Sequence, residues 1–119
     1  MDLVGSHLAA LPEFAVAIES FDDRVSVTLS GHGDDVAAKI LDAALHDVVR
    51  DGRQRNVELE LGDLTELDPR VLGVILGTRA NLDRQGRTLH VVAVSAEAAH
   101  LLEQMGVDRV LDLRDEPDA

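Results

Sequence analysis

The spacing of apolar residues along this chain changes between two periods in a regular order, and this pattern constrains the fold more than any other feature. Alternation at every second residue predicts strands at Phe14–Ile18, Val25–Leu29 and Val57–Leu61. Spacing of three and four residues predicts a helix that follows Asp34 and ends at Gly52, and a second helix from Pro69 to Gln85.

The C-terminal third continues this pattern. Leu89–Val94 is almost continuously apolar, which is typical of a central strand covered on both faces. A short helix is expected at Ala96–Met105, and the residues up to Leu113 fit a last strand or a helical turn. The element order β-β-α-β-α-β-α-(β) predicts a single α/β domain with a mixed, mainly parallel sheet packed with helices.

The two ends of the chain lack this periodicity. We therefore expect residues 1–13 to be an N-terminal extension, residues 14–113 the domain, and residues 114–119 an acidic C-terminal tail. No stretch has the basic start of a signal peptide or the about 20 apolar residues that a membrane span needs. A cytoplasmic location without membrane insertion is the expectation.

Charge and composition exclude several classes of function. The chain has 11 Lys and Arg against 23 Asp and Glu, and its net charge of -12 repels nucleic acid. It contains no Cys, Trp or Tyr, so thiolate metal sites and aromatic platforms for stacked bases are absent. The His residues lack metal-ligand spacing and no Ser lies in a nucleophile motif. We expect no metal, no cofactor and no enzymatic activity, and a protein as the partner.

The most distinctive stretch is Leu61–Gly77. Asp68 is a good helix N-cap and Pro69 suits the first helical position, so the helix start is sharply defined. Arg70 is unusual, because a cation in the first turn faces the positive end of the helix dipole. A surface ion pair and contact with an acidic partner are the two ways to compensate this charge.

Gly73 and Gly77 fall on the side of this helix that faces away from the core. The predicted buried stripe comprises Val71, Val74, Ile75, Thr78 and Leu82. A glycine inside a helix costs about 1 kcal/mol relative to alanine, so this exposed pair favours the close approach of another backbone or a partner. The alternative is that the glycines are tolerated and that Leu72 and Leu76 complete the core.

A series of short segments forms a recognisable pattern when taken in order. They are Leu29–Gly31 before an aspartate-led helix, Val57–Leu61, Leu67–Asp68, Leu72–Gly77 and Gln104–Val110. Together they resemble the STAS domain of anti-sigma factor antagonists, over about Phe14 to Leu113. In that family the loop and helix after the third strand bind an anti-sigma factor, commonly a kinase-like ATPase. Phosphorylation of a serine in an Asp-Ser-Ser-Gly motif breaks the complex.

The resemblance covers this motif only in part. Asp68 matches its aspartate and Val71 falls on its glycine, whereas Pro69 and Arg70 fall on its two serines. Neither Pro69 nor Arg70 has a hydroxyl group, so the ordinary phospho-switch is absent. Thr65 is the nearest hydroxyl in the same loop, and it is either a substitute phosphate acceptor or a support for the turn.

The resemblance implies a protein-binding regulator that engages an anti-sigma factor or kinase-like regulator without serine phosphorylation. The residues expected to contact the partner are Thr65, Asp68, Pro69, Arg70, Leu72, Gly73 and Leu76. The alternative is a STAS scaffold or an accessory subunit of a larger complex, such as a lipid-transport ATPase. A homodimer stays open under both hypotheses.

Overall fold

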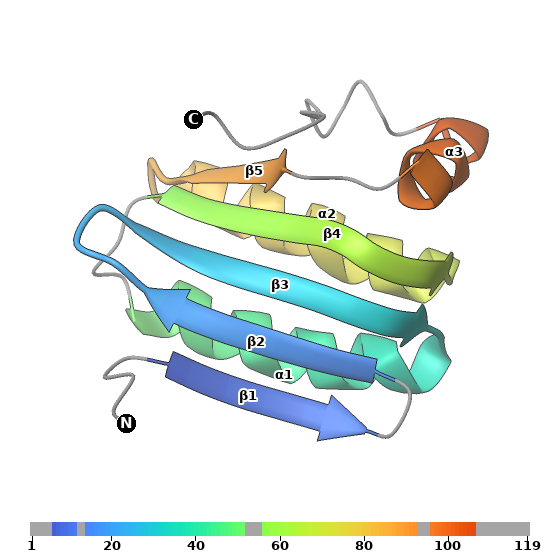
Figure 1. The fold of residues 1–119 in the computed structure, drawn as a ribbon. Coiled ribbons are helices and arrows are strands. Elements are labelled where there is room, and N and C mark those ends of the chain that lie inside the picture. Colours follow the sequence, from blue (N-terminus) through green and yellow to red (C-terminus); the bar gives the residue numbers. More distant parts are fainter. Residues whose placement is uncertain (1–5, 12–13, 52–55, 93–95, 107–119) are drawn as a thin grey trace.

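One mixed β-sheet with helices packed against it makes up the computed structural model, which describes residues 6–11, 14–51, 56–92 and 96–106 (Figure 1). The strands are β1 Ser6–Leu11, β2 Phe14–Ser20, β3 Arg24–Gly33, β4 Asn56–Leu67 and β5 Thr88–Val92, and the helices are α1 Asp35–Asp51, α2 Pro69–Arg84 and α3 Ala96–Gln104. The sheet order is β1-β2-β3-β4-β5. β1, β2 and β3 pair antiparallel, whereas β3, β4 and β5 pair parallel. The predicted α/β fold with a mixed sheet is confirmed.

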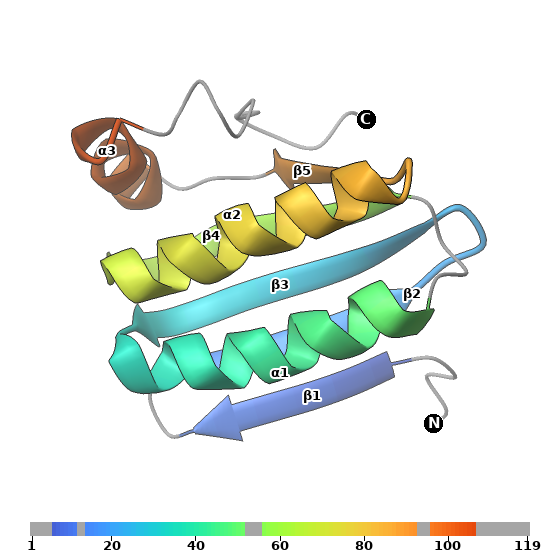
Figure 2. The same cartoon turned by 180° about the vertical axis from the view of Figure 1, so that it is seen from behind.

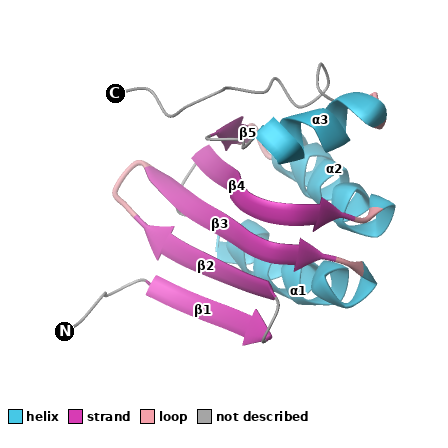
Figure 3. Cartoon of the chain, turned by 45° about the vertical axis from the view of Figure 1, so that its right-hand side comes forward, coloured by secondary structure: helices cyan, strands magenta, loops and turns pink. Residues whose placement is uncertain are grey.

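Two helices cover one face of the sheet. α1 joins β3 to β4 and α2 joins β4 to β5, and the two helices lie side by side (Figure 2). α3 packs against β4 and lies near the C-terminal end of that strand. Over β1, β2 and β3 the opposite face carries no helix among the described residues (Figure 3).

Aliphatic side chains between the sheet and the helices form the core. Val16, Val27 and Leu29 from the sheet are fully buried, as are Leu41 of α1 and Ile75 of α2. Burial of each such side chain stabilises the fold by about 1.5–3 kcal/mol. The predicted buried stripe of α2 faces the sheet, except that Val74 is only half-buried and Leu72 is buried in addition.

β1 differs from the expectation that residues 1–13 form an extension without periodic structure. Ser6–Leu11 pairs antiparallel with β2 in an unbroken register. This strand was missed because Leu8–Leu11 is apolar without interruption and shows no alternation. The domain boundary at Phe14 stays a prediction. Gly52, the predicted last element up to residue 113 and the tail at residues 114–119 lie outside the described residues.

β5 lies at the edge of the described sheet, although a central strand was expected there. Its only strand neighbour among the described residues is β4. Its side chains are nevertheless covered, because Val91 is 0% and Val92 5% exposed. The continuous apolar sequence therefore indicates that both faces of β5 are covered, and it does not require that β5 lie in the middle of the sheet.

β4 is longer than predicted, because it continues through the expected polar loop as far as Leu67. Its register with β3 shifts by one residue at two places. Each shift is a β-bulge that adds one β4 residue against β3. The buried leucines accordingly follow at Leu61, Leu64 and Leu67, three residues apart and not two. This spacing interrupts the two-residue alternation of apolar residues, so the sequence pattern places the end of the strand too early.

A buried arginine ties the end of α1 to the start of β5. Arg87 is 6% exposed, and its Nη1 donates to the Val49 carbonyl and to Gln85 Oε1, each at 2.9 Å. Its Nη2 donates to the Val48 carbonyl at 3.4 Å. The last carbonyls of a helix have no partner within the helix, so the guanidinium caps α1 at the negative end of its dipole.

Arg87→Met should lower the free energy of unfolding by about 2 kcal/mol, because a hydrogen bond to a charged group contributes about 1.5–3 kcal/mol. Urea denaturation followed by circular dichroism measures this loss. Arg84→Met is the matched control on an exposed side chain and should stay within about 0.5 kcal/mol of the wild type. Equal losses in the two variants would contradict the capping role of Arg87.

Candidate functional site

The distinctive stretch lies at the C-terminal edge of the parallel strands β3 and β4. Gly33 and Leu67 pair at the ends of these strands. Each is followed by an aspartate that begins a helix, Asp34 for α1 and Asp68 for α2. Both helices therefore start at the same edge of the sheet, on the left in Figure 2.

Asp68 fixes the start of α2. Its Oδ1 accepts a hydrogen bond from the Arg70 amide at 2.8 Å, and its backbone is extended, with φ -76° and ψ 144°. Pro69 occupies the first helical position. The Asp68 amide donates to the Gly33 carbonyl at 2.6 Å, which ties the helix start to the end of β3. The predicted N-cap and helix start are confirmed.

Gly33 is required by a close approach of two backbones. A Cβ at this position would lie 2.7 Å from the Glu66 carbonyl oxygen, closer than real Cβ contacts. Gly31 adopts φ 92° beside the second bulge, a left-handed conformation that favours glycine. β3 therefore continues through Gly31–Gly33, up to the residue before the N-cap of α1.

Arg70 is paired with the neighbouring helix. Its Nη1 lies 3.4 Å from Asp35 Oδ2, and the two side chains are 70% and 58% exposed. Asp35 thus compensates the charge that is unfavourable at the start of α2. An ion pair this exposed contributes at most about 1 kcal/mol, so a carboxylate of a partner can replace Asp35 at little cost.

Arg70 and Asp35 border an open groove between α1 and α2 with a volume of about 430 Å³. The lining residues are Asp35, Ala38, Lys39, Asp42, Arg70 and Val74. Acidic and basic side chains alternate along it, so the groove favours neither sign of charge as a whole.

The predicted contact residues of α2 differ in exposure. Pro69, Arg70 and Gly73 are exposed. Leu76 is half-buried and packs against the core, whereas Leu72 is 7% exposed and belongs to the core. The Leu72 side chain presents almost no surface to a partner, which corrects its inclusion among the contact residues. A Cβ on Gly73 meets nothing within 4 Å, so no described contact requires glycine there.

Thr65 links the ends of β3 and β4. Its hydroxyl donates to the Gly31 carbonyl at 3.3 Å, and its Oγ1 lies 3.1 Å from His32 Nδ1. His32 Nδ1 in turn lies 3.6 Å from Glu66 Oε1. These contacts favour a local structural role for Thr65, although its side chain is exposed.

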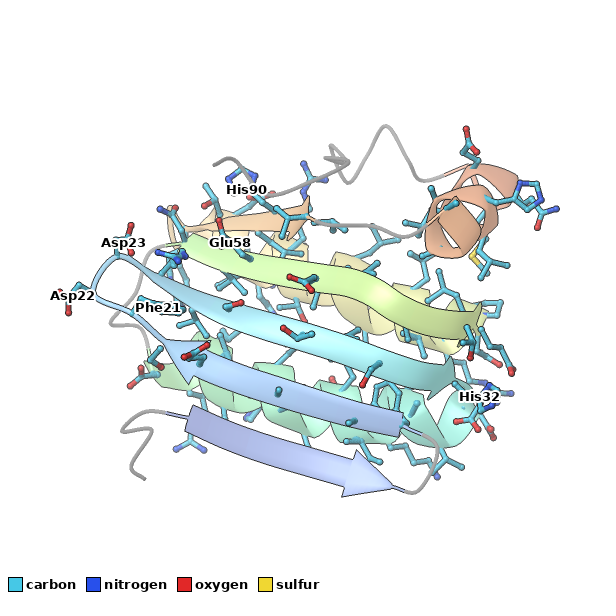
Figure 4. The ribbon with its side chains drawn as sticks, in the orientation of Figure 1. Phe21, Asp22, Asp23, His32, Glu58 and His90 are labelled. Carbon is cyan, nitrogen blue, oxygen red and sulfur yellow. The ribbon has the colours of Figure 1, made fainter. Side chains whose placement is uncertain are left out.

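The end of the sheet opposite His32 is closed by the β2–β3 hairpin, with Phe21 near its tip (Figure 4). Arg24 lies over the Phe21 ring at 4.2 Å and donates to Glu58 Oε1 at 3.1 Å.

Across the described ranges, no group of three or more His, Asp or Glu side chains is placed to hold a metal ion. None of the helices described is long and apolar enough to cross a membrane.

A comparison of the whole sequence with models of protein families identifies the family of this chain. A sequence model of a protein family described as "Mlab, STAS domain" matches residues 16–114. The chain belongs to the STAS domain family. The predicted relationship is confirmed.

This STAS domain resembles solved structures of anti-sigma factor antagonists. One from Mycobacterium paratuberculosis is 23% identical, with a TM-score of 0.77 over 92% of each chain. SpoIIAA in its unphosphorylated form is 17% identical, with a TM-score of 0.67 over 80% of this chain and 95% of the other. A sulfate transporter family protein from Wolinella succinogenes is 17% identical, with a TM-score of 0.64 over 76% and 75%. At these identities the likeness shows the shared fold.

Gly33→Ala should lower the free energy of unfolding by about 1–3 kcal/mol, because the added Cβ displaces the β4 backbone. Gly73→Ala is the matched control, since the same atom enters open space inside a helix and should stabilise the fold by about 1 kcal/mol. Thermal and urea unfolding measure both changes. Shifts of the same sign would contradict the distinction between the two glycines.

Proposed function

We propose that this STAS domain is a protein-binding regulator that docks on an anti-sigma factor or a related kinase-like regulator through the start of α2. The capped and exposed start of this helix carries the proposal. Asp68, Pro69, Arg70 and Gly73 present it at one edge of the sheet, and Thr65 and Leu76 flank it. The fold, which is that of anti-sigma factor antagonists, supports the same role. We place this regulator in the cytoplasm of a bacterium.

Docking at this helix is independent of serine phosphorylation. Pro69 and Arg70 have no hydroxyl group, and Arg70 adds a positive charge where a phosphorylated serine would add about -1.5 to -2. A partner that contacts residue 70 therefore meets a permanent positive charge. Its complementary group at this point is acidic.

A second candidate is a scaffold or an accessory subunit of a larger complex, such as a lipid-transport ATPase. The likeness to a sulfate transporter family protein favours it, because the same fold occurs there in a transporter. This candidate also accounts for the missing phosphate acceptor, since a permanent subunit needs no release step at this surface.

Affinity capture from the native host tests the proposed partner. Tagged wild type should recover an anti-sigma-type kinase, and Arg70→Glu should recover about tenfold less because it reverses a contact charge. Arg50→Glu makes the same charge change at the exposed end of α1 and should recover as much as the wild type. Mass spectrometry identifies and quantifies the captured proteins. Capture of a transporter ATPase in place of the kinase would contradict the first candidate and support the second.

Incubation with this kinase and ATP should leave the wild-type chain unphosphorylated, because residues 69 and 70 lack hydroxyl groups and Thr65 is engaged with β3. Intact-mass measurement detects any phosphate. The restored variant, Pro69→Ser together with Arg70→Ser, is the positive control for kinase activity. Stoichiometric phosphate on Thr65 of the wild type, removed by Thr65→Ala, would contradict the loss of the switch.

A further inference from the structure

α2 is positively charged in an acidic protein. It carries Arg70, Arg79 and Arg84 against one acidic residue, Asp83, whereas the whole chain has a net charge of -12. α1 and α3 each contain more acidic than basic residues. Of the helices that the structure describes, α2 alone offers a local attraction to negative charge.

Five of the exposed residues of α2 form a stripe along the helix, and the exposed Pro69, Asn81 and Asp83 lie outside it. Arg70, Gly73, Gly77, Ala80 and Arg84 are all exposed, and their spacing alternates between three and four residues. We name these five residues the Arg–Gly stripe. This spacing is that of a coiled-coil seam, which keeps facing a partner helix that crosses at about 20°. No described element lies over this side of α2 (Figure 2).

The middle of the Arg–Gly stripe is flat because it lacks side chains. A Cβ at Gly73 or Gly77 would meet nothing within 4 Å, so the described packing gives no reason for either glycine. Glycine is also a poor helix former, which makes two of them inside α2 unfavourable. Small residues four positions apart let two helices approach more closely than the usual 8–10 Å between axes. The shape of the stripe therefore fits another helix.

An arginine marks each end of the stripe. Arg70 and Arg84 are roughly 21 Å apart along the axis, at a rise of 1.5 Å per residue. Their described partners are exchangeable, since Arg70 pairs with the exposed Asp35 at 3.4 Å and Arg84 donates to the exposed Asn81. A helix lying along the stripe meets both arginines when it carries acidic residues about fourteen positions apart.

Charge decides between the occupants that this shape admits. Arg70 and Arg84 lie equally far from Gly77 along the helix, so a second copy of the chain centred on Gly77 would bring arginine against arginine at both ends, whether parallel or antiparallel. A nucleic acid or an anionic membrane extends far beyond the stripe, so it would lie over the surface of a chain whose net charge is -12. A single acidic helix confines its carboxylates to the two arginines, so it avoids the arginines of a second copy and covers little of the acidic surface around the stripe.

We propose that the Arg–Gly stripe is the docking surface for an acidic α-helix of a protein partner, which lies nearly parallel to α2 with carboxylates at Arg70 and Arg84. The proposal rests on the proposed function, because it names the chemistry of the same partner. It extends the docking surface from Leu76 to Arg84.

A peptide of defined composition tests the surface directly. The ¹⁵N-labelled wild-type chain is titrated with an alanine-rich helical peptide that carries two glutamates fourteen positions apart. Amide shifts should appear at Gly73, Gly77 and Arg84, and they should weaken as the salt concentration rises. The same peptide with two lysines in place of the glutamates should cause no shifts there.

Several results would overturn the proposal. Shifts confined to another surface, or equal shifts with the lysine peptide, would remove the acidic helix as occupant. Equal shifts with inorganic phosphate, duplex DNA or phosphatidylglycerol vesicles would show a general anion surface. A dimer mass in light scattering that Gly77→Gln abolishes would assign the stripe to a second copy of the chain.

Substitution of the central glycine separates docking from stability. Gly77→Gln should raise the midpoint of thermal unfolding, because glutamine favours the helix, and should weaken binding of the glutamate peptide by about tenfold. Ala43→Gln places the same side chain on the exposed face of α1 and should leave binding unchanged. If Gly77 is merely tolerated, Gly77→Gln should be more stable than the wild type and should bind the glutamate peptide equally well. That result would overturn the proposal.

Arg84→Glu and Arg50→Glu distinguish this proposal from the function on which it rests. Arg84 lies outside the docking edge Asp68–Leu76, and its reversal should weaken capture of the anti-sigma-type kinase about tenfold, whereas Arg50→Glu should not. Unchanged capture by Arg84→Glu would overturn the acidic helix and leave the proposed function standing. Shifts on the stripe from the glutamate peptide, with no anti-sigma-type protein captured by the wild type, would support the acidic helix and overturn the proposed function.

Discussion

The hydrogen bond from the Asp68 amide to the Gly33 carbonyl, at 2.6 Å, is the contact on which the rest of the site depends. It forms only because Gly33 has no Cβ, since β4 approaches β3 too closely for a side chain at that point. The same aspartate then caps α2 through its side chain, so the end of one strand sets the start of the next helix. These contacts together fix the position of the start of α2 relative to the end of β3.

Periodicity predicted the sheet and helices where the backbone is regular, and it failed where the backbone is not. The N-caps Asp34 and Asp68 could be read from residue type, because capping is a local property. The end of β4 could not, because two bulges change the spacing of its leucines from two to three. The partner of Arg70 was also hidden, since Asp35 is distant in sequence and adjacent only after α1 and α2 pack together.

The surface proposed for docking combines two features with different physical origins and the same consequence. A cation at the start of a helix and glycines within it both disfavour α2 as an isolated element. The fold corrects the first through Asp35 and through the cap, but no described contact corrects the second. α2 therefore carries a stability deficit confined to its outer face. This deficit lies on the surface that we propose for docking, where contact with a partner would offset it.

The two bulges in β4 also affect how relatives of this chain are aligned. Loss of one residue between Leu61 and Leu67 would turn a bulge into regular pairing and leave the pairing of Asn56–Glu60 with β3 intact. Strand and helix would both survive such a deletion, and only the count of residues between them would change. Positions at the start of α2 are therefore matched reliably when they are counted from the capping aspartate, whereas counting forward from the strand can shift the phosphate-acceptor position by one residue.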